Sequence, residues 1–514
     1  MKKINDKSKI YMIVGVVILI IAIVGSTYAY YRYVLTSTNV NTITRGLDYY
    51  INYAKGTDIT SGTLNPSTDY TGGNSVTITL NKKDNTYDIY GHIYLDITTI
   101  SSALSSSNAL KYVVLEGTSK ISEGSLGGVS ASNSYLLAVN IPLKTTSTTY
   151  TVYLWFDETN SNALSAESSS VSAKVKCEAT MKKISDEPYT FSFSRKLVSI
   201  YNASTKTDVT NNSITYKYDT TNNLMQDVGG NIRYYGASPN NYIYFNCSDY
   251  SNQSSSTCET WRIIGVFNNK VKLVRDTSIG RYSWDNKNTT TGAENNNGKN
   301  DWTDARLMKL LNPGYDSETV GGSLYYNAKS GTCYNGQNNA TKDCDFTSIG
   351  IKNSTTRNLI QEVVYNIGGW NANAVYSDFI YEKERGTTVY SGRPTTWTGK
   401  IGLMYPSDYG YAADFTKCKD ASGNDLNIGS YNSDVNDYQC RKNNYLYKVA
   451  FEWVLTPHSG TSSNVWDVSS PGSVNPNYDA YYSDGVRPVV FLSSSQDIAS
   501  GEGKENNPYQ LLVS

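Results

Sequence analysis

Aromatic, acidic and amide side chains gather near the end of the chain, between residues 465 and 484. The candidate ligand-binding residues of this stretch are Trp466, Asp467, Asn475, Asn477, Tyr481, Tyr482 and Asp484, with Tyr478 and Asp479 between them. Aromatic faces edged by polar acceptors suit sugars and peptide partners, because the ring buries apolar area while neighbouring polar atoms accept hydrogen bonds. We expect a binding loop here. The alternative for Trp466 is that it packs the fold, as we expect for Trp453 and Arg487.

Six of the seven cysteines fall into three local pairs, and each pair brackets a polar loop. The pairs are Cys247 with Cys258, Cys333 with Cys344, and Cys418 with Cys440. Such loops have no core of their own, and a crosslink around them contributes about 3 kcal/mol by restricting the unfolded chain. The spacing therefore predicts three disulfides, paired by proximity, and an oxidising exterior. The alternative of free or metal-binding thiols lacks the C-x-x-C spacing of such sites.

Residues for enzymatic catalysis are scarce in the sequence. Cys177 is left over, and we expect a buried free thiol; the alternatives are an intermolecular crosslink or a reactive nucleophile. The chain has two histidines, His92 and His458, and the sequence offers no reason to place either of them beside a nucleophile in the fold. A serine elbow, a phosphate-binding glycine loop and an H-E-x-x-H pattern are missing. We predict that the protein is not an enzyme and uses no cofactor.

Two oxygen-rich loops could coordinate a hard cation such as calcium. One contains Asp420, Asn424 and Asp425, and the other contains Glu294, Asn296, Asn297 and Asp301. Solvated turns explain both loops equally well, so we predict no metal site. The 45 basic residues balance the 46 acidic ones to a net charge of −1. This balance leaves no basic field for nucleic acid, which we exclude as a partner.

The segment from residue 10 to residue 30 is long and apolar enough to cross a membrane, since it spans about 31 Å as a helix. Lysines 2, 3, 7 and 9 precede it, against the single acid Asp6. The positive-inside bias therefore keeps residues 1–9 in the cytoplasm and exports the rest. Two interpretations stay open: a retained single-pass anchor in the cell membrane, or a secretory signal cleaved after Ala29.

Residues 33–182 alternate between apolar and polar positions, with Ser, Thr, Gly and Asn between the runs. Strand-length runs occur at 76–80, 87–95, 110–115, 135–141, 150–156 and 171–179. Period-two alternation with almost no helical period predicts an all-β sandwich. Residues 38–52 fit either a strand or a short helix.

Three motifs of the first part resemble the TasA/camelysin family of exported jelly-roll proteins. They are Ser26 to Tyr31 (STYAYY), Thr38 to Asp48 (TNVNTITRGLD) and Lys174 to Thr180 (KVKCEAT). The resemblance covers roughly residues 10–182. It implies a jelly-roll fold, and its fibre-forming members imply self-association as a matrix subunit. The protease activity associated with the family has no site that maps onto this sequence.

Residues 183–229 are interrupted by asparagines and predict a connector with some strand content. From residue 230 to residue 495 strands and helices mix, which predicts an α+β domain followed by a tail at 496–514. We expect a hairpin that turns at Asn268 and Asn269, helices at 301–312, 355–367 and 374–383, and strands at 400–405, 448–455 and 486–492. Asp301 would cap the first helix.

The order of motifs in this second part resembles the C-type-lectin-like fold, in the version shared with formylglycine-generating enzymes and domains of bacterial surface proteins. The matching pieces are Trp261 to Gly265, Leu310 to Asn312, Lys400 to Asp408, Trp453 to Pro457, Ser470 to Gly472 and Gly485 to Leu492. The enzymes use paired cysteines near the end of the domain, whereas no cysteine follows Cys440 here. The fold hosts many functions, and the resemblance implies a surface adhesin that binds a glycan or protein. The alternative is a matrix or fibre subunit.

Overall fold

The computed structural model describes residues 33–35, 51–55, 58–64, 66–105, 109–158, 170–184, 186–286, 296–315, 321–432 and 439–513. The chain divides into two compact units, Met1–Phe191 and Ser192–Ser514. The apolar segment 10–30 and most of the ambiguous stretch 38–52 lie outside the described residues. Within the ranges just given, no helix is long and apolar enough to span a membrane.

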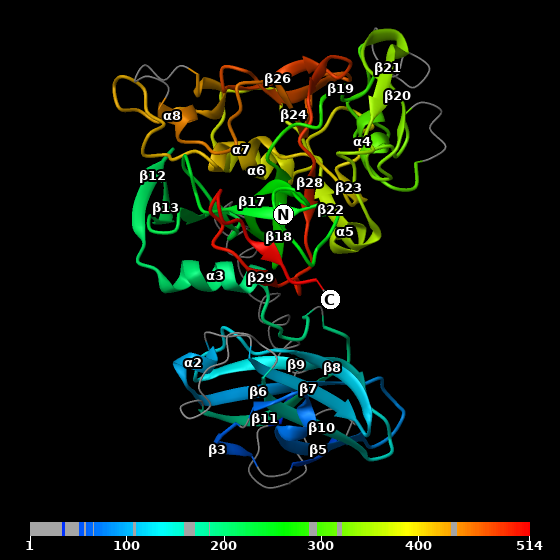
Figure 1. Cartoon of the computed structure of the whole chain (residues 1–514), viewed down its shortest axis with the longest axis vertical. Helices are drawn as coiled ribbons and strands as arrows, with labels where there is room; N and C mark the ends of the chain where they lie inside the picture. Colours follow the sequence, from blue (N-terminus) through cyan, green and yellow to red (C-terminus); the bar gives the residue numbers. More distant parts are fainter. Residues whose placement is uncertain are drawn as a thin grey trace, which may run out of the picture. The chain divides into compact units, whose positions relative to one another are not determined.

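The first unit consists of two sheets, drawn in blue and cyan in Figure 1. One sheet has the order β1 (Tyr33–Leu35), β11 (Ser170–Thr180), β6 (Tyr90–Ile100) and β9 (Asn133–Pro142), with β3 (Ile59–Thr63) also on β11. The other has the order β2 (Ile51–Lys55), β5 (Asn74–Lys82), β10 (Thr148–Asp157), β7 (Leu110–Glu116) and β8 (Ser119–Ser125), with β4 (Pro66–Ser67) on β10. Short helices α2 (Ser102–Ser105) and η1 (Tyr70–Gly72) lie between strands.

Alternate residues of both sheets enclose one hydrophobic core. Examples are Val76, Ile78 and Leu80 of β5, which are buried together with Val152 and Leu154 of β10. All six predicted runs form strands, so the predicted β-sandwich is confirmed. Cys177 lies in this core as a buried free cysteine, and burial raises the pKa of its thiol to about 12.

The second unit is built on a large sheet, with the order β12 (Thr207–Asn211), β13 (Ile214–Asp219), β14 (Leu224–Gln226), β15 (Ile232–Tyr234), β17 (Glu259–Phe267), β18 (Lys270–Arg275) and β28 (Val489–Phe491). Strand β16 (Tyr242–Phe245) also pairs with β17. A second sheet has the order β19 (Arg281–Ser283), β27 (Ser483–Gly485), β24 (Glu452–Pro457), β25 (Asn464–Val468) and β26 (Val474–Asp479). The predicted hairpin turn is confirmed, since β17 pairs with β18 and Asn268 and Asn269 have φ of 48° and 61°.

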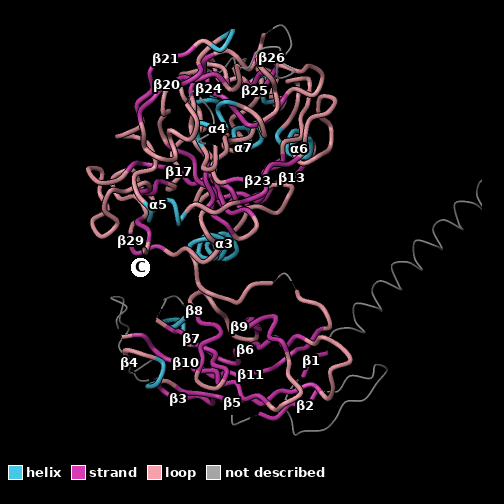
Figure 2. Tube along the Cα trace, turned by 90° about the vertical axis from the view of Figure 1, so that its right-hand side faces the viewer, coloured by secondary structure: helices cyan, strands magenta, loops and turns pink. Residues whose placement is uncertain are grey.

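Shorter elements complete the second unit, and Figure 2 shows that loops occupy much of it. The helices are α3 (Phe193–Ala203), α4 (Arg306–Leu311), α5 (Ser354–Leu359), α6 (Ser377–Glu384), α7 (Pro406–Tyr411), α8 (Gln439–Lys442), η4 (Gln337–Asn339) and η5 (Ile428–Ser430). Two-stranded ribbons join β20 (Ser330–Tyr334) to β21 (Thr341–Asp345), β22 (Val363–Asn366) to β23 (Thr396–Gly399), and β29 (Ile498–Ser500) to β30 (Gln510–Leu511). All three predicted disulfides are present: Cys247–Cys258, Cys333–Cys344 and Cys418–Cys440.

Both flanks of the expected lectin-like region belong to the second unit. The expected connector contributes α3 and β12 to β14, and α3 buries Phe193, Leu197 and Tyr201, which form an apolar stripe four residues apart. The expected tail contributes β29 and β30, in which Leu511 is buried. Residues 192–229 and 496–513 thus help to build the core of this unit.

Two predicted helices differ from the structure. The helix expected at 301–312 begins at Arg306, because the Asp301 carboxylate accepts a hydrogen bond from the Thr303 N–H and closes a turn instead. The helix expected at 355–367 ends at Leu359, and Val363 and Val364 lie in β22. Val364 is 62% exposed rather than buried. These β-branched residues fit a strand, and pairing with β23 provides one.

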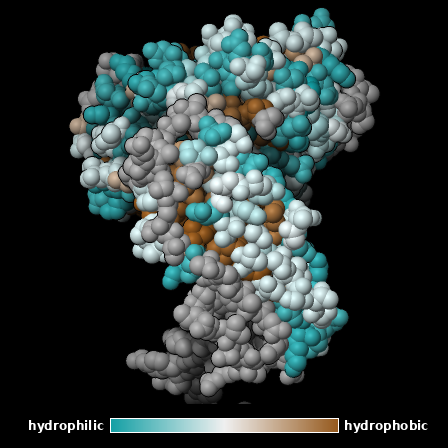
Figure 3. Space-filling model, turned by 60° about the horizontal axis from the view of Figure 1, so that its bottom comes forward, coloured by the Kyte–Doolittle hydropathy of each residue, from teal (hydrophilic) through white to brown (hydrophobic). Residues whose placement is uncertain are grey.

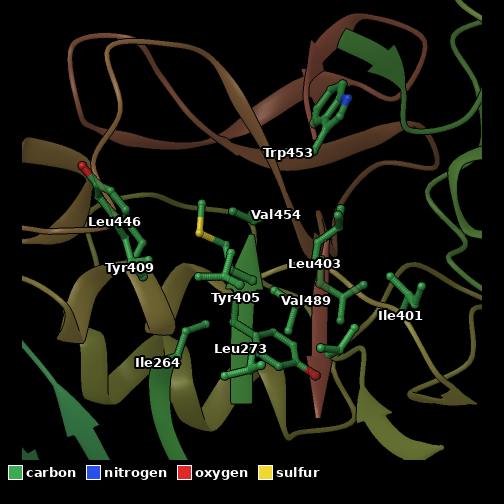
Figure 4. Packing of buried hydrophobic residues seen from close by; sticks show 14 of the residues in the cluster. Ile264, Leu273, Ile401, Leu403, Tyr405, Tyr409, Leu446, Trp453, Val454 and Val489 are labelled. Carbon is green, nitrogen blue, oxygen red and sulfur yellow. The ribbon is translucent and has the colours of Figure 1, made fainter. Parts of the chain in front are cut away.

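The strand expected at 400–405 is mostly loop, in which Gly402 forms a single bridge to Val489. The loop nevertheless crosses the centre of the hydrophobic core, where Ile401 and Leu403 pack near Leu273 and Val489 (Figure 4). The expected strands at 448–455 and 486–492 correspond to β24 and β28. On the face seen in Figure 3, hydrophilic and weakly polar residues predominate over apolar ones.

Candidate functional site

The candidate site lies on one face of the second sheet of the second unit, where three strands bring polar and aromatic residues into one row. Trp453 of β24 is directly opposite Asp467 of β25, and Asp467 is opposite Asn475 of β26. Directly opposed side chains share a face of a sheet. In Figure 4 the indole of Trp453 extends away from the core around Val454, so this row lies on the other face. Its Nε1–H donates to the Tyr282 carbonyl at 2.8 Å and holds the ring in place.

Aromatic rings connect the buried Trp453 to the solvent. The ring of Tyr478 lies 6.2 Å from that of Trp453 and 5.7 Å from that of Phe451. Tyr482 follows at 5.4 Å from Tyr478, and Tyr481 at 4.4 Å from Tyr482. Tyr482 is 44% exposed. The rings therefore form a continuous path from the interior to the surface.

Two buried carboxylates lie beside these rings. Asp467 is fully buried, and neither of its side-chain oxygens has a hydrogen-bond partner among the described residues. Asp484 of β27 is also buried; its Oδ1 accepts from Nη2 of Arg281 at 3.2 Å, whereas its Oδ2 has no partner there. We call Trp453, Asp467, Tyr478, Tyr482 and Asp484 the acid–aromatic cluster.

Electrostatics favour the neutral form of both acids. Burial raises the pKa of Asp467 to about 8, and the nearby charge of Asp484 adds to this effect. Burial also raises the pKa of Asp484 to about 6, although the guanidinium of Arg281 opposes the rise. Burial and the charges of Asp467 and Asp484 raise the pKa of Tyr478, and the charge of Arg281 lowers it. Tyr478 therefore lies within electrostatic reach of both acids and of Arg281.

The other sequence-predicted residues divide between surface and core. Asn475 Oδ1 accepts a hydrogen bond from the N–H of the exposed Asn477, which orders the turn beside Asp467. Trp466 is fully buried and its Nε1–H donates to the Trp370 carbonyl at 3.1 Å, so it packs the core. Sequence reasoning missed Arg281 and Phe451, because Arg281 lies about 200 residues away in β19 and Phe451 immediately precedes β24.

A second group of buried charges differs from the cluster, because its carboxylates are paired. Arg233 bonds Asp227 at 2.5 Å and Asp408 at 2.7 Å, and Lys272 also bonds Asp408. All four side chains are at most 1% exposed. Burial by itself raises the pKa of Asp408, but Lys272 and Arg233 outweigh burial and lower it to about 2. Buried charges that are paired with one another fit a structural role.

The two histidines and the loop of Asp420 have local structural partners, whereas Glu294 of the other oxygen-rich loop lies outside the described residues. His92 Nε2 bonds the Thr180 hydroxyl at 2.8 Å, and His458 Nδ1 accepts from the Gly460 N–H at 2.9 Å. The carboxylate of Asp420 accepts from the N–H groups of Ser422 and Asn424, which is the geometry of a tight turn. In the part of the chain that the structure describes, no group of three or more His, Cys, Asp or Glu side chains could hold a metal ion.

Comparison with known proteins adds no relative to this picture. No family model, curated protein or solved structure matches the chain. The resemblances drawn from the sequence therefore depend on the short motifs quoted for them. The chemistry of the site has to be read from its own residues, which offer carboxylate acceptors next to aromatic faces.

Proposed function

We propose that this chain is a non-enzymatic bacterial cell-surface protein that binds an extracellular ligand through the acid–aromatic cluster of a C-type-lectin-like second unit. The observation that carries the proposal is the path of rings from the exposed Tyr482 through Tyr478 to the buried Trp453, which lies opposite the unpartnered Asp467. Aromatic rings with few convergent polar groups are typical of ligand sites. A site of this kind serves adhesion.

Three features support an extracellular location. Residues 10–30 have the length and flanking charge of a membrane anchor or signal. The three local disulfides are stable in an oxidising compartment and rare in the cytosol. The motif order from Trp261 to Leu492 resembles domains of bacterial surface proteins, and the first unit is a β-sandwich suited to carry the second away from the cell.

Protease treatment of intact cells tests this location. If the proposal holds, trypsin added outside removes epitopes placed after residue 514, while a tag fused before residue 1 stays protected until the cells are lysed. The readout is immunoblotting with antibodies to both tags. Protection of the C-terminal tag in intact cells would contradict an extracellular ligand-binding function.

Paired tyrosine replacements test the binding site. We expect the Tyr481→Ser/Tyr482→Ser variant of the full chain to lose at least tenfold of its affinity on glycan and extracellular-matrix arrays, because the contacts of the ligand with both rings are lost together. The matched control is Tyr70→Ser/Tyr153→Ser, which removes another pair of contacting rings, 5.1 Å apart, from the first unit. Equal binding by both variants would rule out the cluster as the ligand site. Concentration-dependent filaments in electron micrographs, without ligand binding, would instead favour the fibre-subunit function.

A further inference from the structure

The acid–aromatic cluster contains more buried carboxyl oxygens than the described residues provide with partners. Three carboxylate oxygens have no hydrogen-bond partner among the described residues: both of Asp467 and Oδ2 of Asp484. The ion pair at this cluster is that of Arg281 with Asp484, and the Arg281 side chain is 65% exposed. Burying an unpaired carboxylate costs several kcal/mol, so such a group takes up a proton or meets a cation.

Once the two acids are ionised, their three unpartnered oxygens are all acceptors, which determines what a ligand must supply. A neutral sugar offers both donors and acceptors, whereas an ammonium group offers three donors and no acceptor. Calcium takes six to eight oxygen ligands, and the described residues hold no group of three or more metal-binding side chains. The number of carboxylates thus fits an organic cation better than a metal ion.

The surrounding rings favour the same class of ligand. Tyr478 lies within electrostatic reach of both acids, and Tyr482 packs against it at 5.4 Å between ring centroids. A cation is attracted to the face of an aromatic ring. Carboxylates and aromatic rings close to one another are the two elements of an ammonium-binding site.

We infer that the acid–aromatic cluster binds the protonated amine of an extracellular ligand, with the ammonium between Asp467 and Asp484 and against the rings of Tyr478 and Tyr482. This inference rests on the proposed function and names the chemical class of its ligand. The outer groups, Arg281 and Tyr482, move aside to admit the amine, since they are the exposed members of the site. A lysine side chain and an amino sugar both carry this group.

Binding of the ammonium group displaces the proton that the carboxyl groups hold in the free protein. In the free protein burial raises the pKa of Asp467 to about 8 and that of Asp484 to about 6. An ammonium requires the carboxylates to be ionised, so lowering the pH protonates them and competes with the ligand. Asp467 interacts electrostatically with Asp484 and Tyr478, and Tyr478 interacts in turn with Asp484, Tyr482 and Arg281.

Calorimetric titration of the purified full chain tests the inference with four organic probes and one salt. Nα-acetyl-lysine methylamide and glucosamine carry the free amine, Nα,Nε-diacetyl-lysine methylamide and N-acetylglucosamine are their neutral counterparts, and calcium chloride tests a metal. We expect a free amine to bind at least tenfold more tightly than its acetylated form, and at least tenfold more weakly at pH 5 than at pH 8. The amine that binds more tightly shows whether the natural ligand presents a lysine side chain or an amino sugar.

Two variants and one control assign the effect to the cluster. Asp467→Asn keeps the shape but removes the charge, and Tyr482→Leu removes an exposed ring; each lowers amine affinity at least fivefold. The control Asp343→Asn replaces an exposed acid on β21 and leaves the affinity for the amine unchanged. Equal binding of free and acetylated probes, saturation by calcium alone, or no binding of any probe would overturn the inference. The proposed function survives those results if the tyrosine-pair variant still abolishes array binding, and fails if it does not.

Discussion

Replacing Asp408 with alanine lowers the free energy of unfolding of the second unit by about 3 to 5 kcal/mol, which is the range for breaking a buried ion pair. Asp408 is the shared partner of Arg233 and Lys272, and all three side chains are at most 1% exposed. Without the carboxylate, Lys272 loses its ion-pair partner and Arg233 retains only Asp227. The uncompensated charge in the interior causes the loss.

Urea unfolding followed by tryptophan fluorescence measures this loss, because seven of the eight tryptophans lie after residue 191. The matched control is Asp208→Ala, which breaks the pair between Asp208 and Lys217 at the surface, where both side chains are more than half exposed. Exposed pairs contribute about 0 to 1 kcal/mol. If Asp408→Ala costs no more than Asp208→Ala, the buried network does not stabilise the unit as we describe.

The stability of the second unit decreases as the pH rises from about 4 to 8, and Asp467→Asn removes most of this decrease. In the unfolded chain Asp467 ionises near pH 4, while burial raises its pKa in the folded protein to about 8. Between these values the folded state keeps a proton that the unfolded state has released, so raising the pH favours unfolding. At about 1.4 kcal/mol for each pKa unit, the contribution is on the order of 5 kcal/mol over this window.

Two other buried acids, Glu384 and Asp408, also affect how the stability depends on pH. Burial raises the pKa of Glu384 to about 7, although the charge of Arg385 opposes the rise. This raised pKa adds to the loss of stability between pH 4 and 7. Asp408 has its pKa lowered to about 2, so its stabilisation is lost only as the pH falls below about 4. We therefore expect maximal stability near pH 4 to 5.

Guanidinium unfolding at pH 4, 6 and 8 checks the prediction in the wild type, in Asp467→Asn and in the exposed control Asp343→Asn. The control follows the wild type, because the side chain of Asp343 is exposed and folding does not bury it. Parallel pH profiles of the wild type and Asp467→Asn would show that Asp467 is not held neutral by the fold. An amine ligand added at pH 8 should recover part of the lost stability, since it binds only the folded state.

Local patterns in the sequence were sufficient for much of the fold. Period-two alternation predicted the six strand runs of the first unit, because each strand of a sandwich buries every second residue. Proximity predicted the three disulfides, and the adjacent Asn268 and Asn269 predicted a tight hairpin. Each of these features depends on residues that are close in the chain.

Tertiary pairing overrode local pattern elsewhere. Val363 and Val364 match a helical period, but an available partner strand, β23, makes the extended form more favourable. The asparagine-rich stretch before residue 230 reads as a connector, yet Val209 and Tyr216 are buried once β12 and β13 join the large sheet. A single sequence contains no signal for a partner strand that lies far along the chain.

In the candidate site, too, some features follow from the local sequence and others from long-range contacts. The sequence by itself determined that rings and acids are concentrated between residues 465 and 484. Only the tertiary structure decided that Trp466 faces the core while Asp467 is buried without a partner beside Asp484. Strand β24 lies between β25 and β27, and β19 brings Arg281 from about 200 residues away. Burial and charge pairing depend on these long-range neighbours. The neighbours, and not the sequence between residues 465 and 484 alone, make this polar stretch a site able to hold a cation.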